Sequence, residues 1–462
     1  MIAISHRFHT LPYYSAHRHT SMIAQRLLLI FVIGCSFAQP LLGQEEEGSY
    51  TLRECIDIAL KRNLDVLRSA NAVERATSYR TAAYGEFLPR VSAQGSWVRS
   101  DKELIRLRPD GLVQSRNSWN YSVEAGVTIF NGMRNFNTVD KSLLDMQAAE
   151  QYANRRREDV VYLVQEYFYN ALRYKQLMHA HEANLERSSK QLERVRTMNV
   201  VGSVPLADVY RQEVQVGTDE LVLLESGNNY KNILIEMQSV LGLDPNPAFT
   251  LNEAGTETVR ESDMLDFRST IGDFENLVNE AEANRSDFRE AELNIRGAEK
   301  GVAIAKSGHY PSLTAFAQYS WNNLELRDFD EFSRFMYGLS LSVPIFSNFQ
   351  VSTSVQQSEI MLRDTQLARE QLRRNAASEL MKSLNILQAA EVNMDISARK
   401  LQSAREDHRI ASERYSLGSG TLLDQITASA NLRLAESDVI NARFNYLTAQ
   451  SRIEYQLGRT QY

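Results

Sequence analysis

The stretch FLPRVSAQGSW at residues 87–97 joins a helix-like segment to the start of a strand, and YPSLTAFAQYSW at residues 310–321 does the same later in the chain. Pro311 follows Pro89 by 222 residues (311 − 89), and VPIFS from Val343 follows VTIFN from Val127 by 216 residues (343 − 127). The pairs that keep this second interval are Gly202 and Gly418, Asp208 and Asp424, and Leu241-Gly242 with Leu457-Gly458. A repeat of about 200 residues is far longer than a solenoid unit, so the sequence predicts two duplicated halves of one architecture.

The duplication sets the expected domain organisation. We expect a first repeat at residues 50–243 and a second at 273–462, each with a helix, a β-hairpin, a long helix and a further helix. An acidic connector at residues 244–272 joins them. With 43% hydrophobic and 24% charged residues the composition is that of a folded protein, and only 21 glycines and 9 prolines in 462 residues leave room for long helices.

The amino terminus is typical of a secretory signal, which we place at residues 1–43. Arg26 precedes the apolar run LLLIFVI at residues 27–33, and small residues follow. The run is too short to span a bilayer as a permanent helix. A second possibility is a bacterial lipoprotein signal, because Val32-Ile33-Gly34-Cys35 resembles one and would make Cys35 a lipid anchor. Either signal predicts export across the inner membrane.

Charge argues against nucleic acid as a partner. The first 44 residues hold three arginines and no acidic residue, so the other residues hold 48 basic and 58 acidic side chains, a net charge of −10. Nucleic-acid binders carry basic patches instead.

Two segments alternate with the period of two that a strand requires. One face carries Trp119, Tyr121, Val123, Ala125, Val127 and Ile129 in the first half, and Phe335, Tyr337, Leu339 and Leu341 in the second. The other face carries small polar residues and Glu124, with Phe130 at its end. Half-buried strands of a soluble sandwich remain an alternative. We favour a membrane barrel with the apolar face toward lipid, because about 12 residues, tilted, cover roughly 30 Å of bilayer.

Four such strands cannot close a barrel, and open strand edges are not tolerated in lipid. The sequence therefore predicts an oligomer in which each protomer contributes two hairpins. It leaves open whether two, three or four protomers meet.

The helices are predicted to be long. Residues 139–198 contain no proline or glycine. Apolar and small residues there alternate spacings of four and three from Val160 to Val195, and Ala428 to Ile453 repeats the rule, which indicates coiled-coil packing. An ordinary helical bundle is the alternative.

Each long helix is expected to end at a matched turn. Gly202 and Gly418 are the glycines that helix ends favour, and Ser203 and Ser419 are expected to cap the returning helices. Asp208 and Asp424 then lie near helix starts, where they either compensate the helix dipole or, if symmetry gathers the turns, form an acidic ring.

The duplicated order of these segments resembles the TolC-type outer membrane efflux family from Thr51 to Arg459. The segments that carry the resemblance are YGLSLSVPIFSN from Tyr337, RYSLGSGTLLDQI from Arg414 and ARFNYLTAQSRIEYQLG from Ala442, with their first-half echoes. The resemblance implies a homotrimer with a twelve-stranded β-barrel in the outer membrane, continued by a coiled-coil helical barrel in the periplasm. Such a protein is a passive exit duct for an inner-membrane transporter joined by a periplasmic adaptor, or for type I secretion.

The resemblance also implies a periplasmic aperture. Asp424 matches the first aspartate of that aperture and Thr427 stands where the second is expected. Gly420 replaces a basic residue that latches the helices, whereas Tyr415 and Asp208 match its remaining latch partners. We therefore expect a weaker gate, held by a Tyr415–Asp208 hydrogen bond and an acidic ring at Asp424.

No cofactor, metal site or enzyme activity is indicated. The sequence shows no nucleophile with its base, no phosphate loop and no ligand-spaced cysteines, and Cys55 would lack a disulfide partner. His179 and His181 are expected on different sides of a helix. The rival to a channel is a periplasmic coiled-coil adaptor or scaffold, which would have no reason to carry apolar strand faces.

Overall fold

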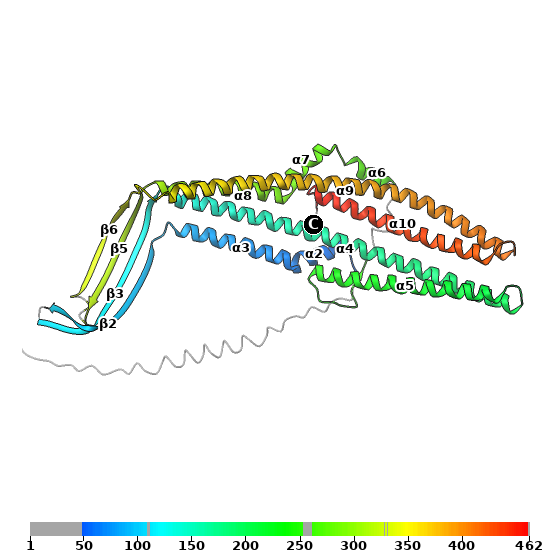
Figure 1. Cartoon of the computed structure of the whole chain (residues 1–462), viewed down its shortest axis with the longest axis horizontal. Coiled ribbons are helices and arrows are strands. Elements are labelled where there is room, and N and C mark those ends of the chain that lie inside the picture. The colour runs from blue at the N-terminus through cyan, green and yellow to red at the C-terminus, as the bar shows by residue number, and fades with distance from the viewer. Residues whose placement is uncertain (1–48, 109–110, 253–260, 328, 330, 461–462) are drawn as a thin grey trace, which may run out of the picture. The chain divides into compact units, whose positions relative to one another are not determined.

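A computed structural model describes residues 49–108, 111–252, 261–327, 329 and 331–460. The predicted signal at residues 1–43 and its Cys35 lie outside these residues. The chain runs through two copies of the same series of elements (Figure 1). This observation confirms the predicted duplication.

The first copy consists of α2 (Leu52–Arg62), α3 (Leu64–Gly85), β2 (Arg90–Arg108), β3 (Gly111–Asn131), α4 (Arg134–Val200) and α5 (Leu206–Leu241). The second consists of α7 (Phe274–Asn284), α8 (Ser286–Lys306), the short helix η1 (Ser307–His309), β5 (Ser312–Asn323), β6 (Ser333–Ser342), α9 (Gln350–Ser416) and α10 (Leu422–Gln456). The remaining elements are β1 (Ser49–Tyr50), which pairs in parallel with β4 (Thr250–Leu251), and α6 (Glu261–Ser269). Helices α4 and α9 each have 67 residues, so the expected long helices are confirmed.

The two hairpins form one antiparallel sheet in the order β2-β3-β5-β6. The sheet lies at one end of α4 and α9, and the turns into α5 and α10 lie at the other (Figure 1). The β3–β5 register shifts between Thr128 and Phe130, because Thr128 pairs with Thr314 while Phe130 pairs with Leu313. The extra residue at Ile129 turns Phe130 onto the apolar face of the sheet. Placing Phe130 on the polar face was therefore wrong.

Side chains at the predicted seams hold the helices together. The seam residues are the positions spaced alternately by four and three from Val160 to Val195 along α4 and from Ala428 to Ile453 along α10. None of these side chains is exposed. Val160, Val164 and Ala171 of the first seam join the core that α4 shares with α2 and α5. Tyr446, Ala449 and Ile453 of the second seam join the core between α9, α10 and α7. Among the described residues, no helix is both long enough and apolar enough to cross a membrane.

The two halves repeat even a close backbone contact. Gly242 and Gly458 end α5 and α10 with φ of 70° and 69°. A Cβ on Gly242 would lie 2.5 Å from the carbonyl oxygen of Arg62, at the α2–α3 joint, and one on Gly458 would lie 2.9 Å from the backbone nitrogen of Arg285, at the α7–α8 joint. Glycine is therefore required both by the left-handed conformation and by the space available.

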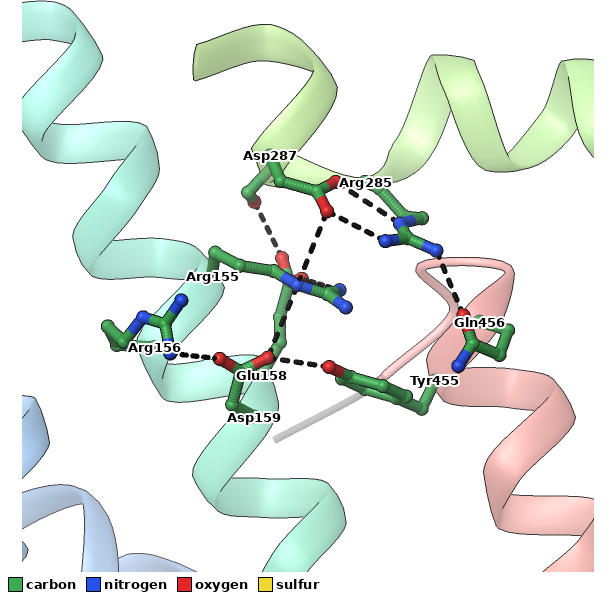
Figure 2. A network of polar contacts seen from close by, with 9 residues as sticks. Arg155, Arg156, Glu158, Asp159, Arg285, Asp287, Tyr455 and Gln456 are labelled. Carbon is green, nitrogen blue, oxygen red and sulfur yellow. Dashed lines mark hydrogen bonds and ion pairs between the residues drawn. The ribbon is translucent and has the colours of Figure 1, made fainter. Parts of the chain in front are cut away.

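A buried polar network ties α4 of the first half to α8 and α10 of the second (Figure 2). Arg155 on α4 donates to Glu158 at 3.0 Å and pairs with Asp159 at 3.2 Å and Asp287 at 3.8 Å. Its guanidinium also lies 4.3 Å from the ring centroid of Tyr455 on α10. The central cation therefore contacts all three helices.

Arg285 and Tyr455 donate further hydrogen bonds to oxygen atoms of the network. Arg285 donates to Asp287 at 2.7 Å and to Gln456 at 2.9 Å, and the Tyr455 hydroxyl donates to Asp159 at 2.7 Å. Burial alone would raise the pKa of Asp287, but the hydrogen bond from Arg285 and the charges of Arg155 and Arg285 hold it below its usual range. The Asp287 carboxylate is therefore ionised at neutral pH and joined to two cations.

Candidate channel-forming surfaces

The sheet has one continuous apolar face. Residues directly opposite each other in an antiparallel pair lie on the same face, and the register places Trp97 opposite Trp119, Tyr121 opposite Trp321 and Val123 opposite Tyr319. On the outer pair, the same face carries Phe335, Tyr337 and Leu339, which pair with Tyr319, Ala317 and Ala315. Six of the residues predicted for this face therefore lie on it together, namely Trp119, Tyr121, Val123, Phe335, Tyr337 and Leu339.

Many apolar side chains on this face are exposed in the single chain. Tyr337 is 79% exposed, Leu339 67% and Phe335 64%, and Tyr121 is also exposed, while Trp119 and Val123 are partly covered. Contiguous exposed apolar surface on a folded protein marks a surface that contacts another protein or lipid.

The opposite face is polar and hollowed. A cavity of about 830 Å³ lies over it, lined by residues from the end of α3 and from strands β2, β3 and β5, among them Ser92, Glu124, Thr128, Thr314 and Gln318. The Gln318 amide donates to the Glu124 carboxylate at 2.6 Å. This face suits contact with water.

The sheet is open at both sides. In the portion of the chain that the structure describes, β2 and β6 are the outer strands, each paired along one edge. Their free edges present unpaired backbone donors and acceptors, which need a partner strand wherever water is excluded.

The two long helices end in matched turns. Gly202 and Gly418 take φ of 78° and 71°, and the following residues, Ser203 and Ser419, donate their backbone N–H to Met198 and Arg414 at 2.8 and 2.9 Å. This is the hydrogen bonding of a glycine-terminated helix.

The predicted capping role of Ser203 and Ser419 was wrong. The N-cap of α5 is Pro205, and that of α10 is Thr421. The Ser419 hydroxyl instead donates to the Arg414 carbonyl at 3.1 Å, at the end of the preceding helix. In each turn, two residues lie between the glycine and the N-cap of the next helix, so the N-cap comes later in the sequence than predicted.

Asp424 forms a capping box with Thr421. The Thr421 hydroxyl donates to the Asp424 carboxylate at 2.7 Å and accepts from the Asp424 N–H at 3.1 Å, and the Thr421 N–H donates to the same carboxylate at 3.2 Å. The side-chain hydrogen bond from Thr421, followed by the backbone one, lowers the pKa of Asp424. Asp424 and Thr427 are both exposed, and Thr427 donates only to the Leu423 carbonyl one turn back, at 2.9 Å.

The predicted Tyr415–Asp208 hydrogen bond is not formed. Asp208 accepts instead from Arg211, three residues later on α5, at 2.8 Å. The buried Tyr415 side chain packs against Val195, Val209 and Leu422, and its hydroxyl has no hydrogen-bond partner. Burial raises the pKa of Tyr415, and the negative charge of Asp208 adds to the effect.

The structure shows other links between the two helix pairs that the sequence did not reveal. The Gln191 amide on α4 donates to Gln425 on α10 at 2.9 Å, and Arg187 on α4 pairs with Glu436 on α10 at 2.8 Å. In the sequence, Gln191 adjoins the seam residue Leu192, and Gln425 adjoins Asp424 of the predicted aperture. These positions were the sequence signal that could have indicated the contact.

Steric contact explains the glycine at position 420. A Cβ there would lie 3.0 Å from the Arg414 Cβ and 3.2 Å from the Tyr415 backbone nitrogen. A basic side chain would fit only if this turn shifted, so the absence of that latch agrees with the local backbone.

Two histidines lie two residues apart on α4. His179 is exposed and His181 is buried, so they lie on different sides of α4 as predicted. Over the described ranges, no group of three or more potential metal-ligating side chains occurs.

Comparison with known proteins relates the chain to one family. The family described as "Outer membrane efflux protein" matches residues 55–243 and 277–459. Outer membrane protein TolC of Escherichia coli (strain K12) is 23% identical over 303 residues, which cover 63% of this chain and 59% of TolC. The chain thus matches about three-fifths of the length of TolC. Nodulation protein T of Rhizobium leguminosarum bv. trifolii is 20% identical over 452 residues, which cover 92% of this chain and 93% of that protein.

Solved structures show the same fold. The Vibrio cholerae outer membrane protein VceC matches with a TM-score of 0.73 at 17% identity, over 88% of this chain and 96% of VceC. The Campylobacter jejuni CmeC outer membrane channel matches with a TM-score of 0.75 at 18% identity, over 88% of this chain and 85% of CmeC. Since the family match covers most of both duplicated halves, this chain belongs to the outer membrane efflux protein family.

Proposed function

We propose that this chain is one subunit of a trimeric, passive exit duct that crosses the outer membrane and extends into the periplasm. The observation that carries the proposal is a four-stranded sheet with one bare apolar face and one polar face, joined to two 67-residue helices. Helices of that length reach about 100 Å, several times the thickness of a bilayer, so they must project into water.

Oligomerisation follows from the open edges of the sheet. Four strands per chain fall short of the roughly eight that the smallest barrels use, and pairing β2 with β6 of neighbouring copies would close a larger one. Three copies give twelve strands, the number that membership in this family favours.

The partners in the proposal are a periplasmic adaptor and an inner-membrane transporter that supplies the energy. Relatives named as a pyoverdine export outer membrane protein of Pseudomonas aeruginosa and a probable efflux pump outer membrane protein of Pseudomonas putida support this assignment. The first name refers to the export of pyoverdine and the second to an efflux pump, so we favour small-molecule efflux over type I protein secretion.

The helix tips would form the periplasmic aperture. In a threefold arrangement the exposed Asp424 side chains would form an acidic ring with Thr427 beside them, and the neighbouring turns at Gly202 and Gly418 would surround it. Because the Tyr415 hydroxyl has no partner, the closed state would depend on the Gln191–Gln425 and Arg187–Glu436 links instead.

Single-channel recording tests this gate. Asp424→Asn retains an oxygen for capping and should reduce cation selectivity, and Gln425→Ala should raise the open probability. Tyr415→Phe should leave both unchanged. A gate that opens in Tyr415→Phe but not in Gln425→Ala would reject this assignment.

A cellular experiment tests the function itself. Deleting the gene should sensitise the bacterium to dyes and detergents, with the secreted proteins unchanged, and the wild-type gene should restore resistance. Tyr337→Arg should fail to restore it, because a cation facing lipid costs about 2–4 kcal/mol at the bilayer midplane. Met336→Arg, the neighbouring residue on the polar face, should succeed.

Two outcomes would contradict the proposal. One is a freely soluble periplasmic monomer with no change in sensitivity on deletion, which would favour an adaptor or scaffold. The other is equal tolerance of arginine at positions 336 and 337, which would show that neither face meets lipid.

A further inference from the structure

A single aromatic side chain stands on the polar face of the sheet. Arg90, Gly126, Phe316 and Gly338 lie side by side across the four strands. In the row beyond them are Ser92, Glu124, Gln318 and Met336. Phe316 is 40% exposed and lines the cavity of about 830 Å³ on this face.

Glycines on both sides make room for this ring. A Cβ on Gly338 would lie 3.1 Å from Cζ of Phe316, so the phenyl ring lies over the bare backbone of β6. A Cβ on Gly126 would meet one atom within 4 Å, the Ala315 carbonyl oxygen at 3.9 Å. The surface beside the ring, on β3, is therefore a hollow floor.

The duplication shows that this arrangement is particular to the second half. The residues that correspond to Phe316 and Gly338 in the first half are Gln94 and Ser122, which also face each other across paired strands. A polar pair on one hairpin is thus an aromatic–glycine pair on the other. Fold geometry alone does not require an aromatic ring here.

Charged groups surround the ring on the cavity wall. Glu124 and Glu86 contribute two carboxylates against the single cation of Arg90. Glu124 accepts a hydrogen bond from Gln318, which fixes its carboxylate one row from the ring. An aromatic face beside an acidic wall attracts organic cations through the ring quadrupole and through charge.

We propose that this cavity is a binding site for flat organic cations in transit, with the Phe316 ring as one wall, Gly126 as the floor and Glu124 as the counter-charge. The proposal rests on the proposed function, because it places this face inside the duct. It gives the duct a preference of its own for cationic aromatic cargo.

Blockade of single channels by ethidium tests the site. The wild-type oligomer, reconstituted in planar bilayers in potassium chloride, should be blocked in a concentration-dependent way. Phe316→Leu keeps a large apolar side chain but removes the aromatic face, and it should weaken blockade about fivefold. Gly126→Val should abolish blockade by filling the floor. Ser320→Ala, a polar-face residue outside the cavity lining, should leave blockade unchanged.

The outcomes separate this inference from the function on which it rests. Potassium chloride currents in all four proteins, with equal ethidium blockade in wild type, Phe316→Leu and Gly126→Val, would overturn the site and leave the duct intact. Equal blockade of the wild type by anionic pyrenesulfonate would overturn the preference for cations. A wild-type oligomer that carries no current would overturn both proposals.

Discussion

Replacing Arg155 by alanine should destabilise the joint between the two halves of the chain. The Arg155 side chain is 7% exposed and faces Glu158, Asp159 and Asp287. Removing one partner of a buried ion pair costs about 3–5 kcal/mol, because the carboxylate that remains is desolvated without its cation.

The remaining contacts place the expected loss at the lower end of that range. Asp287 keeps Arg285 at 2.7 Å, Asp159 keeps Arg156 at 2.9 Å, and Glu158 keeps the Ser286 hydroxyl at 2.6 Å. We therefore expect Arg155→Ala to lower the free energy of unfolding by about 3 kcal/mol.

The assay is guanidinium unfolding in detergent at fixed protein concentration, followed by far-ultraviolet circular dichroism. The matched control is Arg399→Ala, which removes an α9 ion pair to Asp395 whose two side chains are 70% and 68% exposed. Exposed pairs of this kind contribute less than about 1 kcal/mol. If Arg155→Ala unfolds at the same midpoint as Arg399→Ala, the buried network does not hold the halves together and the reasoning fails.

Three further predictions concern a carboxylate of this network, two glycines in turns and a buried thiol. The pKa of Asp287 is lowered in the folded protein, so the stabilisation that this carboxylate provides is present above its ordinary pKa and is lost as the pH falls through the folded value. At pH values below about 4, the guanidinium concentration at the unfolding midpoint should therefore decrease. The decrease should be smaller in Asp287→Asn. Gly132→Ala should prevent correct folding, because its Cβ would lie 2.7 Å from the Ser307 carbonyl oxygen, and the measurement is loss of the native oligomer. The control is Gly202→Ala, where a Cβ meets no atom within 4 Å, and it should cost only about 1–2 kcal/mol of backbone strain. Burial raises the pKa of Cys55 to about 12, so in a variant with no other cysteine the thiol should resist iodoacetamide at pH 8 and react only on unfolding; rapid labelling of the folded protein would contradict its buried position.

Local periodicity explains how much of the fold was predictable. The alternation around Tyr121 and Tyr337 and the heptad positions from Val160 to Val195 specify which side of each element is apolar over many residues, so the strands and long helices followed from sequence. The bulge at Ile129 was missed because a register shift depends on the partner strand.

Side-chain partners were less predictable, because several groups compete for each of them. Asp208 pairs with Arg211 on its own helix rather than with Tyr415, although an Arg three residues away was visible in the sequence. The contact between Arg155 and Asp287 joins residues far apart in sequence that carry no motif, so only the packing of α4 on α8 reveals it.

The most direct test of the account concerns the two faces of β6. Spin labels on single cysteines, one at each position from 335 to 342, would report accessibility to oxygen, which partitions into lipid, and to a water-soluble nickel chelate. We predict alternation with a period of two, in which Phe335→Cys, Tyr337→Cys and Leu339→Cys favour oxygen while Met336→Cys, Gly338→Cys and Ser340→Cys favour nickel. Uniform access of the nickel chelate to both faces would contradict the placement of this sheet in a membrane.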